Sequence, residues 1–191
     1  MTRRRSRAAA VLGVAVSLSM LSCSAMRKGP AADDPPDVQK TVALAQRSIS
    51  SANHQKALEL LHGAYKEHPE NAPLRSAYIR AVEQTRKEAD AVFATQRYQA
   101  AGALYAALLK GDFHTAGFAG ELSFGMDYLK GRIRTCARIL TKNGLVKYRE
   151  GKLDAAIAVW EKVLAFDPGN AEVKNALGTA KAQLKNLKKL Q

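Results

Sequence analysis

The chain has little of what stabilises small domains or builds β-sheets. Its 191 residues include only two cysteines and six prolines, and aromatic residues make up 6%. Two cysteines cannot supply a disulfide framework. No stretch rich in Val, Ile and Thr alternates with polar residues, as a half-buried strand does. Because Ala and Leu dominate the apolar residues, the composition predicts an all-α protein whose helices pack through small side chains.

Residues suited to catalysis or metal binding are also sparse. The histidines are His54, His62, His68 and His114. They show no H-x-x-x-H spacing and no cluster with Cys or Asp, so we expect no metal site, with His62 and His68 in solvent. The glycine-rich segment 111–125 lacks G-K-[ST], which argues against phosphate binding and favours a loop that leads into a helix. Cys136 lies on an apolar helix face, which predicts a buried thiol rather than a nucleophile. We therefore expect no enzyme, no cofactor and no small-molecule substrate.

The charge is strongly positive, with 30 Lys and Arg against 17 Asp and Glu. Residues 1–22 hold four of the arginines and no acid, so the remainder carries 26 minus 17, or +9. A charge of this size favours attraction to anionic surfaces. The basic residues are spread along helices and are not interleaved with aromatics, so we do not expect nucleic-acid binding.

The N-terminus predicts export. Residues 1–22 combine the basic MTRRRSR with about fourteen apolar or small residues, which is too short a run to span a bilayer. The sequence MLSC at 20–23 resembles the bacterial lipobox. That resemblance implies cleavage before Cys23, acylation of Cys23 and a lipid anchor in the membrane. An ordinary cleaved signal peptide with an incidental cysteine is the alternative.

A spacer separates this anchor from the body of the protein. Residues 23–37 contain Pro30, Pro35 and Pro36 and are otherwise small or charged, so we expect a flexible tether. Ser24 follows the cysteine where inner-membrane lipoproteins carry Asp. By resemblance to lipoproteins, this residue implies sorting to the outer membrane, with the domain facing the periplasm.

Helical periodicity covers the rest of the chain, residues 38–191. We expect helices at about 38–50, from the turn SSANH to Pro69, and from a cap at Asn71 to about 95. A single long helix is expected at 118–149, with a kink at Gly125 or Gly131, and an extra helical hairpin around 114–135 is the alternative.

The pattern also repeats. Two sets of residues share the offsets 0, 4, 7 and 12, namely Ala57, Leu61, Ala64 and Pro69, and Ala156, Trp160, Val163 and Pro168. Ala101 begins a third such set. The intervals between the first members, 44 and 55 residues, exceed a 34-residue repeat by close to three and six helical turns, so we expect lengthened first helices.

The segment 139–170 resembles the tetratricopeptide repeat (TPR), in which small residues allow two helices close contact and a bulky residue fills the gap. The residues that carry the likeness are Gly144, Tyr148, Ala156, Trp160 and Pro168. Leu177-Gly178 follows Asn143-Gly144 by 34 residues, the length of one repeat. The resemblance implies a short helical solenoid over 38–191. The lysine-rich final helix would cap the solenoid, with membrane binding as the alternative role of its lysines.

In this family the first helices line a concave face that binds peptides. The resemblance therefore implies a partner groove formed by Arg138, Thr141, Lys142, Leu145, Tyr148 and Arg149. A basic groove with one aromatic residue favours an acidic or extended peptide. A generic solvated face is the alternative. The sequence thus predicts a membrane-anchored adaptor or scaffold with a protein partner in cell-envelope assembly, or else a binding module for an anionic envelope polymer.

Overall fold

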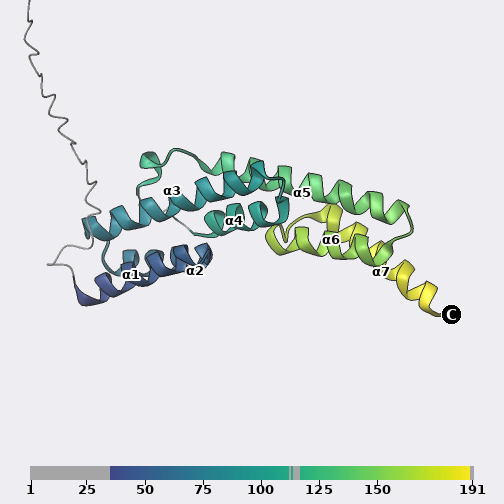
Figure 1. Ribbon diagram of the computed structural model, residues 1–191, viewed down its shortest axis with the longest axis horizontal. Coiled ribbons are helices and arrows are strands. Elements are labelled where there is room, and N and C mark those ends of the chain that lie inside the picture. Colours follow the sequence, from purple (N-terminus) through teal and green to yellow (C-terminus); the bar gives the residue numbers. More distant parts are fainter. Residues whose placement is uncertain (1–34, 112, 114–116, 190–191) are drawn as a thin grey trace, which may run out of the picture.

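The structure, a computed structural model, describes residues 35–111, 113 and 117–189. This part of the chain contains seven α-helices, one 3-10 turn and no strand. The helices are α1 (Pro36–Ser50), α2 (His54–Glu67), α3 (Ala72–Ala94), α4 (Tyr98–Lys110), α5 (Met126–Arg149), α6 (Leu153–Phe166) and α7 (Ala171–Lys189). They run roughly along the long axis of the molecule, with α1 and α2 at one end and α7 at the other (Figure 1). The predicted all-α solenoid is confirmed.

The same tight turn joins the helices of three successive pairs, α1–α2, α3–α4 and α5–α6. One residue in each turn has a left-handed backbone, with φ of 58° at Ala52, 60° at Gln96 and 74° at Gly151. The amide of each donates to the carbonyl three residues earlier, at 2.9, 2.9 and 3.0 Å. Each turn residue precedes by five positions a fully buried alanine, namely Ala57, Ala101 and Ala156. All three pairs are therefore copies of one unit.

Helix starts follow the capping residues. Asn71 accepts a hydrogen bond from the Leu74 amide at 2.8 Å and begins α3, as predicted. Asn170 accepts one from the Val173 amide at 3.0 Å in the same way. The first helix begins at Pro36, two residues earlier than expected. Proline is tolerated there because the first helical amide has no partner within the helix. The end of the predicted tether, 36–37, is thus helical.

The prediction of one helix over 118–149 was wrong at its start. α5 begins at Met126 and continues unbroken through Gly131, while Gly125 ahead of it has an extended backbone, φ −117° and ψ 178°. The described residues between α4 and α5 hold only the 3-10 turn η2 (Ala119–Glu121), so they show no extra hairpin. The residues by which the interval from Ala101 to Ala156 exceeds a 34-residue repeat therefore lie partly in a long α5 and partly in a connecting segment.

Aromatic side chains explain why this connecting segment, residues 117–125, does not continue the α-helix of α5. Phe118 is 1% exposed and lies edge-on to Tyr65 and Tyr78, with ring centroids 5.6 and 5.1 Å away. Phe124 lies 5.7 Å from the buried Phe113. Rings at these positions reach α2 and α3 only if the backbone leaves the axis of α5. Burial of the rings outweighs the local helical periodicity.

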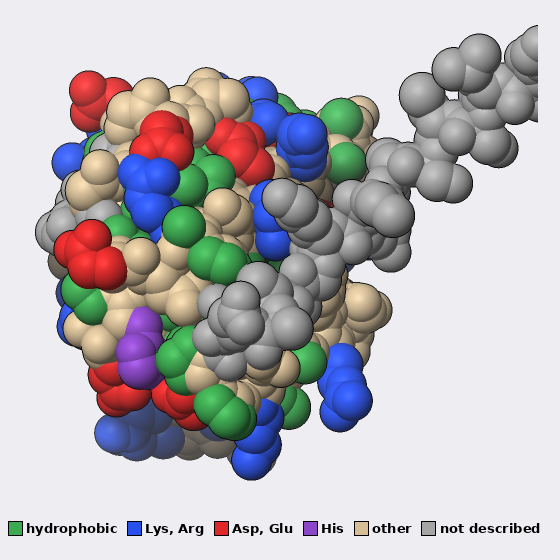
Figure 2. Space-filling view, turned by 90° about the vertical axis from the view of Figure 1, so that its left-hand side faces the viewer, with side chains coloured by type: hydrophobic (Ala, Val, Ile, Leu, Met, Phe, Trp, Pro, Cys, Tyr) green, Lys and Arg blue, Asp and Glu red, His purple; other side chains and the backbone are tan. Residues whose placement is uncertain are grey.

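The last helix covers the end of the core. α7 buries Val173 and Ala180 against the preceding pair and exposes most of its other side chains, including Leu187. A polar outer helix is what a solenoid needs at its end. At the opposite end, charges of both signs are interspersed with apolar side chains (Figure 2). None of the helices described here is both long and apolar enough to cross a bilayer.

Candidate binding surface

The most strongly charged helix is α5, which contains seven Lys or Arg residues and a single acid, Asp127. Five of the basic residues are exposed, namely Lys130, Arg134, Arg138, Lys142 and Arg149. They recur every four residues from Lys130 to Lys142, so they lie along one side of the helix. The opposite side buries Leu129, Ile133 and Cys136.

Of the six residues predicted to line a partner groove, four lie on this exposed side. Arg138, Lys142 and Arg149 are exposed, and Leu145 between them is 38% exposed. No acid in the described part of the chain forms an ion pair with these three cations. The structure therefore brings together four of the predicted residues on a solvated, basic helix face.

The other two predicted residues, Thr141 and Tyr148, are half-buried and contact Trp160 of α6, Thr141 through its backbone carbonyl and Tyr148 through its ring. The indole nitrogen of Trp160 donates to the Thr141 carbonyl at 3.2 Å, and the Tyr148 ring lies 5.9 Å from the Trp160 ring. Gly144 makes this contact possible, because a Cβ at that position would lie 2.3 Å from the indole nitrogen. The Thr141 carbonyl and the Tyr148 ring thus contribute to the contact between the two helices, together with Ala156, Trp160 and Val163, which are buried as predicted.

Gly144 of α5 thus receives the buried Trp160 of α6, the close helix contact that the resemblance to the TPR implied. Residues 144–185 match the family model of the TPR repeat. Neither a curated protein nor a solved structure matches the chain. TPR repeats generally mediate protein–protein interactions, and proteins of this family are typically non-enzymatic scaffolds. The matched TPR segment begins at Gly144, so most of the basic face of α5 precedes it.

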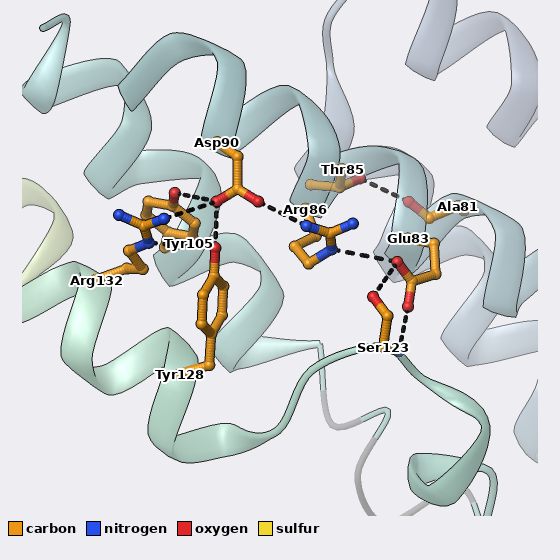
Figure 3. A network of polar contacts seen from close by, with 9 residues as sticks. All are labelled: Ala81, Glu83, Thr85, Arg86, Asp90, Tyr105, Ser123, Tyr128 and Arg132. Carbon is orange, nitrogen blue, oxygen red and sulfur yellow. Dashed lines mark hydrogen bonds and ion pairs between the residues drawn. The ribbon is translucent and has the colours of Figure 1, made fainter. Parts of the chain in front are cut away.

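A half-buried polar network, which the sequence did not predict, ties this face to the middle of the solenoid (Figure 3). Asp90 of α3 accepts hydrogen bonds from the hydroxyls of Tyr105, at 2.6 Å, and Tyr128. Arg86 donates to its second oxygen at 2.6 Å, and Arg132 of α5 lies 3.8 Å away. Burial raises the carboxyl pKa of Asp90, but the two phenols and the guanidinium groups outweigh this effect and hold it below its ordinary value.

The network continues to the connecting segment. Arg86 also contacts Glu83 at 3.2 Å, and Glu83 accepts from both the amide and the hydroxyl of Ser123, at 2.6 and 2.8 Å. The spacing of Glu83, Arg86 and Asp90 was visible in the sequence as an intrahelical pattern. Their partners on α4, on α5 and in the connecting segment were not, because only the fold brings them together. The network thus links α3 to α4, to α5 and to the connecting segment.

The histidines differ in part from expectation. His54 is buried, with its Nδ1 3.1 Å from the Thr85 hydroxyl, and burial lowers its pKa. His62, predicted in solvent, is half-buried beside Tyr78. His68 bonds to Asp37 at 2.9 Å.

The sequence showed no grouping that could hold a metal ion, but the fold creates one. The possible ligand atoms of Asp37, Glu67 and His68 lie within 4.8 Å of one another. Both carboxylates are exposed. The bond between His68 and Asp37 accounts for this grouping without an ion.

Cys136 is fully buried in α5, as predicted, and burial raises its thiol pKa to about 11. It is therefore a poor nucleophile at neutral pH. Two shallow hollows lie away from the basic face, one near the end of α1 around Gln46 and Arg47, the other beside Leu184 of α7. The predicted signal peptide 1–22, Cys23 and His114 lie outside the described residues.

Proposed function

We propose that this protein is a lipid-anchored TPR adaptor that holds a protein partner at the bacterial envelope, on the periplasmic face of the outer membrane. The supporting observation is the exposed face of α5, where Arg138, Lys142 and Arg149 have no acidic partner in the described part of the chain. Most arginines on the neighbouring α3 surface are paired instead, as Arg75 and Arg86 are. Unpaired cations beside a TPR repeat suit electrostatic recognition of another protein.

The anchor is proposed from the sequence MLSC at 20–23. The chain has two cysteines, and Cys136 is buried in the core. Cys23 is therefore the residue open to acylation. Two or three acyl chains hold a protein at a membrane where one does so only marginally, since each buried methylene contributes ~0.8 kcal/mol.

The anchor is tested by growing cells with an alkyne analogue of palmitate and detecting the label on the purified protein. Wild type and Cys136→Ser are expected to carry the label and to fractionate with the outer membrane. Cys23→Ser is expected to lose the label completely. Label retained in Cys23→Ser would show that the lipid is attached elsewhere or that the lipobox interpretation is wrong.

The adaptor role is tested by placing a photoreactive amino acid at Lys142 and, as a matched control, at the exposed Gln183 of α7. Irradiation of intact cells is expected to crosslink position 142 to one discrete protein, with little product at position 183. Crosslinking of position 142 only to a heterogeneous, non-protein smear would contradict the adaptor and favour the alternative.

That alternative is a module for an anionic envelope polymer. Its support is the charge of α5, which has seven basic residues and one acid. A polymer with many repeating charges would bind with a steep dependence on salt, because added ions screen exposed charges beyond about 10 Å at 0.1 M. A protein contact that includes Leu145 would retain a component that salt does not remove.

A further inference from the structure

We propose that the C-terminal end of α7 binds the surface of a membrane that contains anionic phospholipids. The residues concerned, called here the α7 tip, are Leu184, Lys185, Leu187, Lys188 and Lys189. They lie at the end of the solenoid opposite to α1 and outside the basic face of α5 (Figure 1). This contact is separate from the proposed adaptor role, and it adds a second attachment to the proposed anchor.

The charge of α7 has a single sign after the first turn. Glu172 is its one acid, and residues 173–189 contain five cations, all of them lysines. Lys181 is paired with Glu161 of α6 at 2.7 Å. Among the described residues, no ion pair involves any of the three lysines of the α7 tip. Their ammonium groups are therefore available to lipid phosphates, which attract clustered lysines to a membrane surface.

Leucines and lysines of the α7 tip form two adjacent stripes. Leu184 and Leu187 are three positions apart, as are Lys185 and Lys188, so each pair lies on one side of the helix. Lys188 follows Leu184 by about one turn, so the two stripes border each other. Leu187 is 47% exposed and Leu184 is half-buried. An exposed apolar stripe beside lysines is the pattern of a helix that lies in the interface of a membrane.

The end of α7 can present this side to a flat surface because it projects from the body of the solenoid. α7 has 19 residues against 14 in α6, and residues 167–170 connect the two helices. The difference of five places residues 185–189 past the start of α6, and Figure 1 shows this end extending beyond the other helices. Earlier on the same side, Ala180 is fully buried. A bilayer can therefore reach the α7 tip without displacing α6.

The side chains of the α7 tip favour a lipid surface over a partner helix. A docked helix would need a series of apolar anchors over two or more turns, whereas the tip offers Leu184 and Leu187. Lysine stems can lie along the interface while their ammonium groups stay in water. A shallow hollow at the tip can accommodate a phosphate group, and it is lined by Leu184 and by Lys181, Lys185, Lys188 and Lys189.

The proposed anchor would strengthen this contact. Cys23 precedes Pro36 by 13 residues, so an anchor there would hold the start of α1 within ~45 Å of the bilayer. The α7 tip then reaches the surface when the solenoid lies along it. A chain already held at one point meets the surface at a high effective concentration, so a weak contact at the tip suffices.

The test measures cosedimentation with vesicles of phosphatidylcholine, either alone or mixed in equal parts with phosphatidylglycerol. The protein is the chain from residue 23 onward with Cys23→Ser, which keeps every described helix but has neither the signal peptide nor an acyl chain. Binding is expected to be roughly tenfold or more tighter with phosphatidylglycerol. Lys185→Gln/Lys188→Gln/Lys189→Gln is expected to weaken that binding roughly tenfold or more, and Leu187→Ser about threefold or more.

Matched variants elsewhere separate the α7 tip from charge and hydrophobicity in general. Arg134→Gln/Arg138→Gln/Lys142→Gln removes three exposed cations of α5. Leu44→Ser removes a leucine of α1 that is 38% exposed. Each is expected to change binding less than about twofold, because neither site touches the bilayer in this arrangement. Circular dichroism confirms that all variants keep their helices.

Absence of binding to the phosphatidylglycerol vesicles, or an equal loss in the lysine variant of α7 and the variant of α5, would overturn the inference. An unchanged affinity of Leu187→Ser would do the same. A discrete protein crosslinked at position 183 in intact cells would assign this end of α7 to a protein partner instead. The adaptor role is tested separately at position 142, so it stands or falls independently of the vesicle results.

Discussion

Replacement of Gly144 by Ala tests whether the contact between α5 and α6 has the geometry described above. The new Cβ would lie 2.3 Å from the Trp160 indole nitrogen and 2.7 Å from two of its ring carbons. Real Cβ atoms do not approach other atoms so closely, so the indole must move. Trp160 is only 2% exposed and donates a hydrogen bond to the Thr141 carbonyl, which leaves it little freedom to do so.

Two effects of opposite sign determine the magnitude. Alanine is more favourable than glycine inside a helix by ~1 kcal/mol. Forcing an extra carbon into a packed core costs ~1–3 kcal/mol, and the loss of the Trp160 hydrogen bond adds ~1 kcal/mol. The steric cost exceeds the gain in propensity. We therefore expect Gly144→Ala to lower the free energy of unfolding by ~1–3 kcal/mol.

Gly178 is the matched control, because it lies 34 residues after Gly144 at the corresponding position of α7. A Cβ there would meet no atom within 4 Å. Because no steric cost arises, only the higher helix propensity of alanine acts, so Gly178→Ala is expected to stabilise the protein by ~0.5–1 kcal/mol. The same substitution thus has opposite signs at two equivalent positions of the repeat.

Urea unfolding, followed by circular dichroism and by the fluorescence of Trp160, the single tryptophan, measures both changes. In a Trp160→Ala background, itself expected to lose ~3–5 kcal/mol, Gly144→Ala should become stabilising because the obstructing ring is absent. A stabilising effect of Gly144→Ala in the wild-type background would refute the close contact. So would an unchanged destabilisation after Trp160 is removed.

Three further predictions concern polar side chains, two of them buried or half-buried and one exposed. Asp90→Asn should destabilise the protein by ~1–3 kcal/mol, because it leaves two phenols and two guanidinium groups without their anion. Glu161→Gln, which breaks an exposed ion pair with Lys181, should cost no more than ~1 kcal/mol in the same urea assay. Because burial lowers the pKa of His54, its contribution to stability is complete above pH 6.5 and is lost as pH falls through the lowered pKa. His54→Gln should therefore reduce the decline in stability between pH 7 and 5, and an identical decline in the variant would contradict this assignment.

The repeat at the C-terminal end of the chain was predictable because it rests on local rules. Gly144 lies on one helix and Ala156 and Trp160 on the next, and the short turn at Gly151 folds the two helices so that the small residue meets the bulky one. The Asn71 cap and the length of α3 follow from short-range signals in the same way. The left-handed turns at Ala52 and Gln96 carry no glycine, so the similarity of all three turns emerged only from the backbone.

The connecting segment was not predictable from periodicity. Phe118 and Leu122 continue the helical phase of α5 in the sequence, and nothing local distinguishes them from its later residues. Phe118 leaves that phase because Tyr65 and Tyr78, 53 and 40 positions earlier, form a site that buries its ring. Hydrophobic burial over such distances overrides local propensity.

By itself, the sequence determined the helical class, the repeat unit and the excess of positive charge, because these depend on composition and on intervals of a few residues. Tertiary structure decided which charges remain available to a partner. Arg132 and Arg138 are alike in the sequence, yet the fold places one beside Asp90 and Phe93 and leaves the other in solvent. Tyr148 was likewise predicted to face a partner, and the fold places its ring beside Trp160. Pairing and burial depend on neighbours from other helices, whose positions no local pattern specifies.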